Sequence, residues 1–156
     1  MRVGNTFGAT ALSSYGGFWI SFAMIETAEG FGITAAYGTD AAMLHNALGF
    51  YLTGWFIFTT ILWLFTLRST FAFCLLFFVV DFVFLFLMIA HFKEADGHDG
   101  TGWTKAAGIV GCVAAFLAWW NAMAGMADKN NSFFTIPVYH FPWSAKAEDA
   151  NKAKKV

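Results

Sequence analysis

The sequence predicts an all-α integral membrane protein, a helical bundle with four transmembrane helices. Apolar residues make up 58% of the 156 residues and charged residues only 12%, which is far from the composition of a soluble domain. Apolar segments at about 7–25, 45–66, 71–90 and 106–127 are each near the length that a spanning helix needs, about 20 residues. Because these segments are apolar on all sides and do not alternate, they favour helices over the strands of a β-barrel.

The first of these segments is rich in Gly, Ser and aromatic residues and carries no charged side chain. A signal peptide has a shorter apolar run behind basic residues, so we expect a retained span that starts close to the beginning of this sequence. Small residues recur at every fourth position, at Ala9, Ser13, Gly17 and Ser21. This spacing favours close packing against another helix over a pore-lining face.

The basic residues predict the orientation of the chain in the membrane. Seven of the nine lysines and arginines fall on one side of the predicted spans, against Lys93 and Lys105 on the other. The seven are Arg2, Arg68, Lys129, Lys146, Lys152, Lys154 and Lys155. By the positive-inside rule both termini lie in the cytosol. We expect a membrane domain over 1–131, followed by an interfacial segment and a cytosolic tail over 132–156.

Asp81 is the one acidic residue in the middle of a predicted span. A charged carboxylate at the bilayer centre costs on the order of 3 kcal/mol, so it needs a partner or water. Asn121, Asn46 and Ser14 are candidate hydrogen-bond donors. Two interpretations stay open: a protonated Asp81 bonded between helices, or a group on a solute or proton pathway.

Tyr15 lies deeper in the first span than the interfacial belt where tyrosine usually anchors a helix. Its hydroxyl either bonds a neighbouring helix or lines a narrow aqueous path. Asn5 and Thr6, at the cytosolic end of the same span, serve either as a helix cap or as a polar vestibule.

Little in the sequence points to catalysis or to a cofactor. The loop 91–99 contains His91, Glu94, Asp96, His98 and Asp99, but their spacing matches no standard metal site. Glycine-rich phosphate-binding motifs are absent, so we expect no ATP-driven chemistry, no catalytic residue, no cofactor and no nucleic-acid partner. Membrane lipid is the partner that the composition implies.

Several motifs together resemble the acetate uptake transporter family, which includes bacterial succinate-acetate permeases and fungal acetate and ammonia-export proteins. They are Gly4-Asn5-Thr6-Phe7-Gly8, Ser14-Tyr15-Gly16 with Phe18-Trp19, Asn46-Ala47-Leu48-Gly49 with Gly54-Trp55, and Trp119 with Asn121-Ala122. The resemblance implies six spans, cytosolic termini, a plasma-membrane location and a hexamer with one pathway through each protomer. It covers nearly the whole chain apart from the tail.

The chain departs from the family pattern at one point. The family's Asn-Pro-Ala-Pro-Leu-Gly-like motif lies in its first span, whereas no proline precedes Pro137 here. The sequence is thus expected to match spans three to six and to lack the first two. In the family a phenylalanine of the first span, the tyrosine of Ser-Tyr-Gly and an aliphatic residue of the fifth span form a constriction. The last two correspond to Tyr15 and to Val80 or Val79, with Asp81 beside them.

The resemblance therefore implies transport of acetate or related short monocarboxylates, linked to protons, along a pathway that includes Asn5, Thr6, Tyr15, Val79, Val80, Asp81 and Asn121. Two alternatives remain open. The chain is a non-transporting truncated paralogue or fragment that packs into a family oligomer, or it exports ammonia or ammonium.

Overall fold

The computed structural model describes residues 6–27, 31–127, 130–144 and 147, and this part of the chain is helical with no named strand. Its helices are α1 (Thr6–Glu26), α2 (Ile33–Ala36), α3 (Ala41–Thr66), α4 (Phe71–Ala95) and α5 (Thr101–Met126). The prediction of an all-α protein is confirmed. The short α2 was not expected; it lies between Gly32 and Gly38, whose positive φ angles of 64° and 58° suit glycine.

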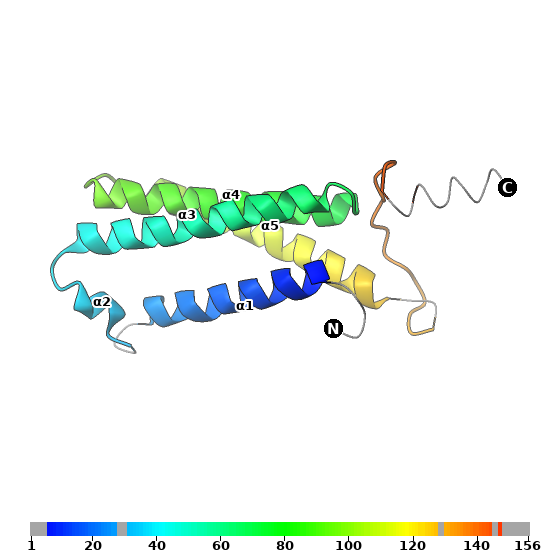
Figure 1. The fold of residues 1–156 in the computed structure, drawn as a ribbon, viewed down its shortest axis with the longest axis horizontal. Coiled ribbons are helices and arrows are strands. Elements are labelled where there is room, and N and C mark those ends of the chain that lie inside the picture. The colour runs from blue at the N-terminus through cyan, green and yellow to red at the C-terminus, as the bar shows by residue number, and fades with distance from the viewer. Residues whose placement is uncertain (1–5, 28–30, 128–129, 145–146, 148–156) are drawn as a thin grey trace.

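Two helix pairs pack closely, α3 with α4 and α4 with α5. In Figure 1, α3 and α4 form a long antiparallel hairpin, and α1 runs along the same direction at a distance from it. The backbone of α1 does not approach α3 or α4 closely. Large aromatic side chains fill the space between them, and the candidate functional site is built there.

Side-chain caps explain where α3 and α4 begin. The Asp40 carboxylate accepts a hydrogen bond from the Met43 backbone N–H (2.9 Å), and the Thr70 hydroxyl accepts one from the Phe73 N–H (3.3 Å). Such caps bind backbone donors that the first helical turn leaves unpaired. The helices extend past the predicted spans, starting at Ala41 rather than 45 and ending at Ala95 rather than 90, because capping and helix propensity do not stop where hydrophobicity stops.

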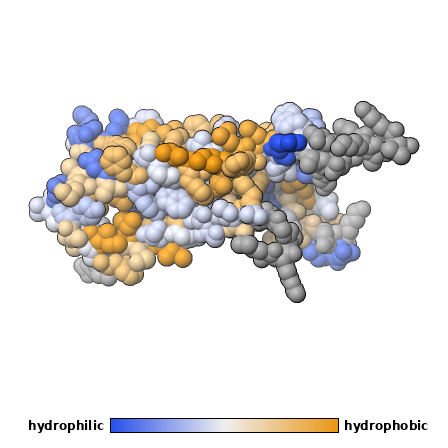
Figure 2. Space-filling view, in the orientation of Figure 1, coloured by the Kyte–Doolittle hydropathy of each residue, from blue (hydrophilic) through white to orange (hydrophobic). Residues whose placement is uncertain are grey.

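Three helices among the described residues are long and apolar enough to cross a membrane: α3, α4 and α5. α1 has the length, at 21 residues, but does not reach the same hydropathy. Figure 2 shows hydrophilic residues gathered mainly toward the two ends of the molecule, with apolar and weakly polar residues covering the length between them. This is the surface of a multi-pass membrane protein.

The described segment after α5, residues 130–144, is non-helical and returns to the turn between α3 and α4. The Tyr139 carbonyl accepts a hydrogen bond from the Phe71 N–H (2.8 Å), and the Trp143 indole N–H donates to the Leu67 carbonyl (2.8 Å). The segment thus covers a helix turn whose backbone groups would otherwise need other partners.

The middle of the small-residue face predicted for the first span is exposed in the described part of the chain, whereas Ser21 at its end shares a hydrogen bond with Tyr51 of α3 (2.7 Å). Ser13 and Gly17 are exposed, and a Cβ added to Gly17 would meet nothing within 4 Å. The hydroxyls of Ser13 and Ser21 bond to carbonyls of their own helix. The spacing correctly identified a smooth face, but α1 turns its aromatic face, not this one, toward α3 and α4.

Candidate functional site, a closed contact between two cavities

Tyr15 stands at the centre of the contact between α1, α3 and α4. Its hydroxyl shares a hydrogen bond with the Thr59 hydroxyl of α3 (2.9 Å). Its ring stacks on Phe84 of α4, with ring centroids 6.3 Å apart and an interplanar angle of 8°. The first interpretation of Tyr15, a bond to a neighbouring helix, is therefore met, and its ring also contacts Trp55 and Phe58, which line one of the cavities described next.

Two partly open cavities lie along α1, one toward each end of this contact. One, of about 290 Å³, is lined by Ser14 of α1 and by Tyr51, Gly54, Trp55 and Phe58 of α3. The other, of about 470 Å³, lies toward the α3–α4 turn and is lined by Phe7, Phe65, Thr66, Ser69 and Phe73. Both have mainly apolar walls that also carry hydroxyl groups.

A buried apolar cluster contacts residues that line both cavities. It consists of Ala11, Leu62 and Phe77, with Tyr15 and Phe58 packed against it. Ala11 lies between the cavity residues Phe7 and Ser14 in α1, so the cluster occupies the level between the two cavities. We call these five residues the apolar plug.

A second cluster continues from Tyr15 toward the other end of α1. Phe18, only 1% exposed, packs with Leu52 and Phe84, and Val80 contacts this cluster. Val80 and Tyr15 thus border the same cluster from α4 and α1. Ser21 and Tyr51 add a hydroxyl pair at 2.7 Å one turn further along.

Asp81 is buried, with 8% of its surface exposed, and faces α3. The Thr60 hydroxyl lies 3.1 Å from Oδ1 and 3.0 Å from Oδ2 and donates to the carboxyl group. Its partner is thus a residue that the sequence analysis did not consider. Of the three donors considered there, Asn121 is bonded elsewhere, and neither Asn46 nor Ser14 is a hydrogen-bond partner of Asp81 in the described part of the chain.

The remaining predicted site residues lie at different places. Thr6 is the exposed first residue of α1, Val79 is half-buried on α4, and Asn5 lies outside the described residues. Asn121 joins α5 to α4, because its side-chain N–H groups donate to the carbonyls of Ala72 (3.1 Å) and Leu117 (2.8 Å). The structure therefore gathers Tyr15, Val80 and Asp81 around the α1–α3–α4 contact and uses Asn121 at another helix contact.

Sequence reasoning missed Thr59, Thr60 and Tyr51. Each is a hydroxyl within the apolar run of α3, and each pairs with a polar group of α1 or α4. A hydroxyl in an otherwise apolar span was the available signal, since such groups seek partners across helices.

The helices and their surface define a multi-pass α-helical membrane protein. Residues 1–143 match the GPR1/FUN34/yaaH family, and the chain belongs to this family. It is 56% identical to "Acetate permease A" of Emericella nidulans over 148 residues, covering 92% of this chain and 50% of the relative.

Other relatives carry two kinds of name. "Ammonia transport outward protein 2" of Saccharomyces cerevisiae is 45% identical, over 91% of this chain and 48% of its own length. "Acetate transporter protein patA" of Aspergillus clavatus is 30% identical, over 86% and 55%. The chain spans about half the length of the curated relatives it matches. No solved structure matches it.

Proposed function

We propose that this chain carries acetate or a related short monocarboxylate across the membrane, along the contact between α1 and the α3–α4 hairpin. The observation that carries the proposal is the pair of cavities on either side of the apolar plug. A plug of this kind closes the pathway, and a solute has only the short distance between the two cavities to cross. Relatives named for acetate support the choice of solute.

The cavity walls favour a neutral solute. Apart from Gly54, the described lining residues are aromatic or hydroxyl-bearing, with no lysine or arginine among them. A carboxylate would lose its hydration there without a counter-charge, which costs far more than moving the undissociated acid. The proposal therefore includes proton linkage, with Asp81 beside the path as the titratable group of the span.

We infer that the protein has four spans, of which α1 is the first. It lies in the plasma membrane, with both termini in the cytosol. The membrane domain covers 1–131, and 132–156 forms an interfacial segment and tail. Asn5 and Thr6 form the cytosolic mouth, and Tyr15, Val79, Val80, Asp81 and Asn121 belong to the pathway. The exposed small-residue face of α1 supports assembly into a homo-oligomer, a hexamer by resemblance.

Two other functions have support. Export of ammonia is favoured by the relatives named for outward ammonia transport, and neutral ammonia also suits apolar walls. A non-conducting role inside a family oligomer is favoured by the loose approach of α1 to the other helices, which leaves one side of the contact open to a neighbouring subunit.

Uptake of labelled acetate at acidic external pH tests the proposal, in cells that lack their own acetate carriers. We expect uptake above a vector control, lost in Tyr15→Ala and kept in Tyr37→Ala, a tyrosine outside the long helices. Uptake equal to the control, at matched membrane levels, would favour the non-conducting role. Ammonia released into the medium, measured in the same cells, tests the export alternative.

A further inference from the structure

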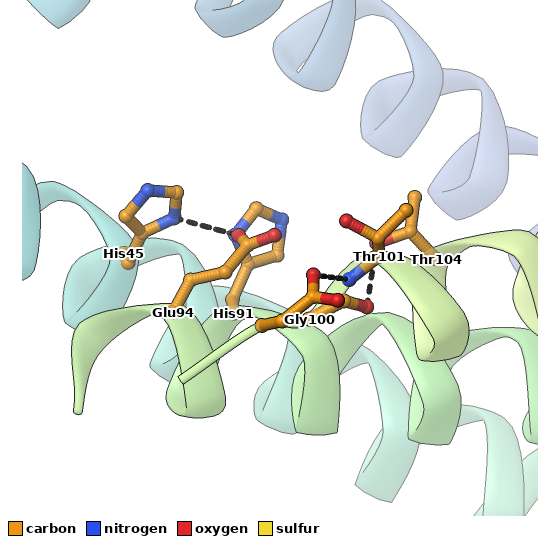
Figure 3. A network of polar contacts seen from close by, with 7 residues as sticks. His45, His91, Glu94, Gly100, Thr101 and Thr104 are labelled. Atoms are coloured by element: carbon orange, nitrogen blue, oxygen red, sulfur yellow. Dashed lines mark hydrogen bonds and ion pairs between the residues drawn. The ribbon is translucent and has the colours of Figure 1, made fainter. Parts of the chain in front are cut away.

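The strongest cluster outside the proposed pathway lies at the end of the bundle opposite the α3–α4 turn. His45 stands near the start of α3, and His91 and Glu94 lie in the last turns of α4, three residues apart and on one face of that helix. Figure 3 shows the three side chains turned toward one another from the two helices. All three are partly exposed, so the cluster is open to solvent.

Three ligand atoms converge at this point. The Nδ1 atoms of His45 and His91 are 3.1 Å apart, and the Glu94 Oε2 atom lies 3.1 Å from the first and 3.6 Å from the second. The Glu94 oxygen offers a lone pair when the carboxyl group is ionised, and each Nδ1 atom offers one when the neutral ring carries its proton on Nε2. A single proton shared among the three atoms can form a hydrogen bond along only some of the three contacts between them.

The triangle has the size of one face of a zinc tetrahedron. Zn²⁺ binds imidazole nitrogen and carboxylate oxygen at about 2.0–2.2 Å, which sets neighbouring ligand atoms about 3.3 Å apart. A circle through the three observed atoms has a radius of about 1.9 Å, so an ion at normal bond length would sit about 0.8 Å above their plane. That is close to the height in a regular tetrahedron, and it leaves the fourth position to water.

Two glycines set the arrangement. Gly49, one turn after His45, leaves room for the ring of Phe92, the residue after His91. Gly100 lies against α4 so closely that an added Cβ would be 2.7 Å from the Ala90 carbonyl oxygen and 2.8 Å from Glu94 Oε1. The helix contact and the following loop thus hold the ligands in place before any ion arrives.

We propose that His45, His91 and Glu94 form a binding site for a divalent transition-metal ion, with Zn²⁺ as the best match. Two imidazoles and one carboxylate suit zinc, and they disfavour Mg²⁺ and Ca²⁺, which prefer oxygen ligands alone. The ion would link α3 to α4. The loop 91–99 by itself does not match a metal site, and none was expected there. The third ligand, His45, lies in α3, 46 positions before His91.

Zinc titration of the full chain tests this proposal independently of transport. The chain is purified in detergent without a histidine tag, stripped with a chelator, and titrated with Zn²⁺ against a chromophoric zinc indicator. We expect one zinc per chain, and a rise in thermal unfolding temperature on adding zinc. Co²⁺ in place of Zn²⁺ should give the intense visible absorption of a tetrahedral site.

Each of His45→Gln, His91→Gln and Glu94→Gln should weaken zinc binding at least about tenfold, since even groups that only support zinc ligands cost this much. His98→Gln and His140→Gln, the other two histidines, are matched controls and should bind as the unaltered chain does. Circular dichroism of each metal-free variant verifies folding, and Glu94→Gln preserves the shape of the site. Absence of stoichiometric zinc in the folded unaltered chain, or tight binding in the folded His45→Gln and His91→Gln variants, would overturn the proposal.

Discussion

Phe92 of α4 lies where a side chain on Gly49 of α3 would have to be. A Cβ built on Gly49 would come within 2.6 Å of Cε1 and 2.8 Å of Cδ1 of the Phe92 ring. Gly49 is buried, and Phe92 also meets the ring of Phe50 edge-on at 5.3 Å. This contact lets the two helices approach at the end of the hairpin where His45 and His91 face each other.

Gly49→Ala should therefore destabilise the protein. The methyl group would displace a rigid ring in a packed contact, and overpacking of this kind costs about 1–3 kcal/mol. We expect a lower thermal unfolding temperature in detergent. Gly108→Ala in α5 is the control: its added Cβ meets nothing within 4 Å, so it should be neutral or stabilising. An unfolding temperature unchanged by Gly49→Ala would show that α3 and α4 can separate there at no cost.

The Tyr15–Thr59 hydrogen bond should contribute measurably to the docking of α1. Tyr15→Phe removes the hydroxyl but keeps the ring stacked on Phe84, so we expect a loss of about 1 kcal/mol. Thr59→Val removes the other partner. A double-mutant cycle of unfolding free energies should give a coupling of about 0.5–1.5 kcal/mol. Strictly additive effects would mean that the two hydroxyls do not depend on each other.

The hydrophobicity of the sequence predicted the positions of the helices along the chain well. It predicted poorly how each helix is rotated about its own axis. α3, α4 and α5 stand close to where apolar segments were expected, because spanning length and composition are strong signals. From Phe71 to Ala90, α4 is apolar on all sides except at Asp81, so no polar stripe in this stretch reveals which face meets α3. The small-residue face of α1 was expected to pack against another helix, but Ser13 and Gly17 in its middle are exposed.

The pairing of α3 with α4 follows a regular offset that sequence alone did not reveal. Gly49 and Thr60 are 11 positions apart, as are Asp81 and Phe92, and 11 residues are about three helical turns. Once Phe92 is placed on Gly49, Thr60 must therefore face Asp81. The buried Asp81 could be predicted from its depth, but its donor needed the register of the hairpin.

Asp99, in the loop before α5, should make folding stability depend on pH. Hydrogen bonds from Thr101, first from its side chain and then from its backbone N–H (2.8 Å), hold the pKa of Asp99 below its ordinary value of 3.8. Its contribution is therefore complete above that value and is lost as the pH falls through the lowered pKa. The difference in unfolding temperature between the unaltered chain and Asp99→Asn should be present at neutral pH and vanish in strong acid. A difference that stays constant with pH would contradict this assignment.

Asp81→Asn should flatten the pH dependence of monocarboxylate uptake if Asp81 carries the accompanying proton. An asparagine has the same shape and can still accept the Thr60 hydrogen bond, so the helix contact is kept while proton uptake and release are lost. Rates measured over a range of external pH, at matched membrane levels and at a constant concentration of the undissociated acid, should become nearly constant. Asp96→Asn, in the exposed loop after α4, is the control and should keep the original profile. If Asp81→Asn also kept that profile, Asp81 would not titrate during transport and would serve only to join α3 and α4.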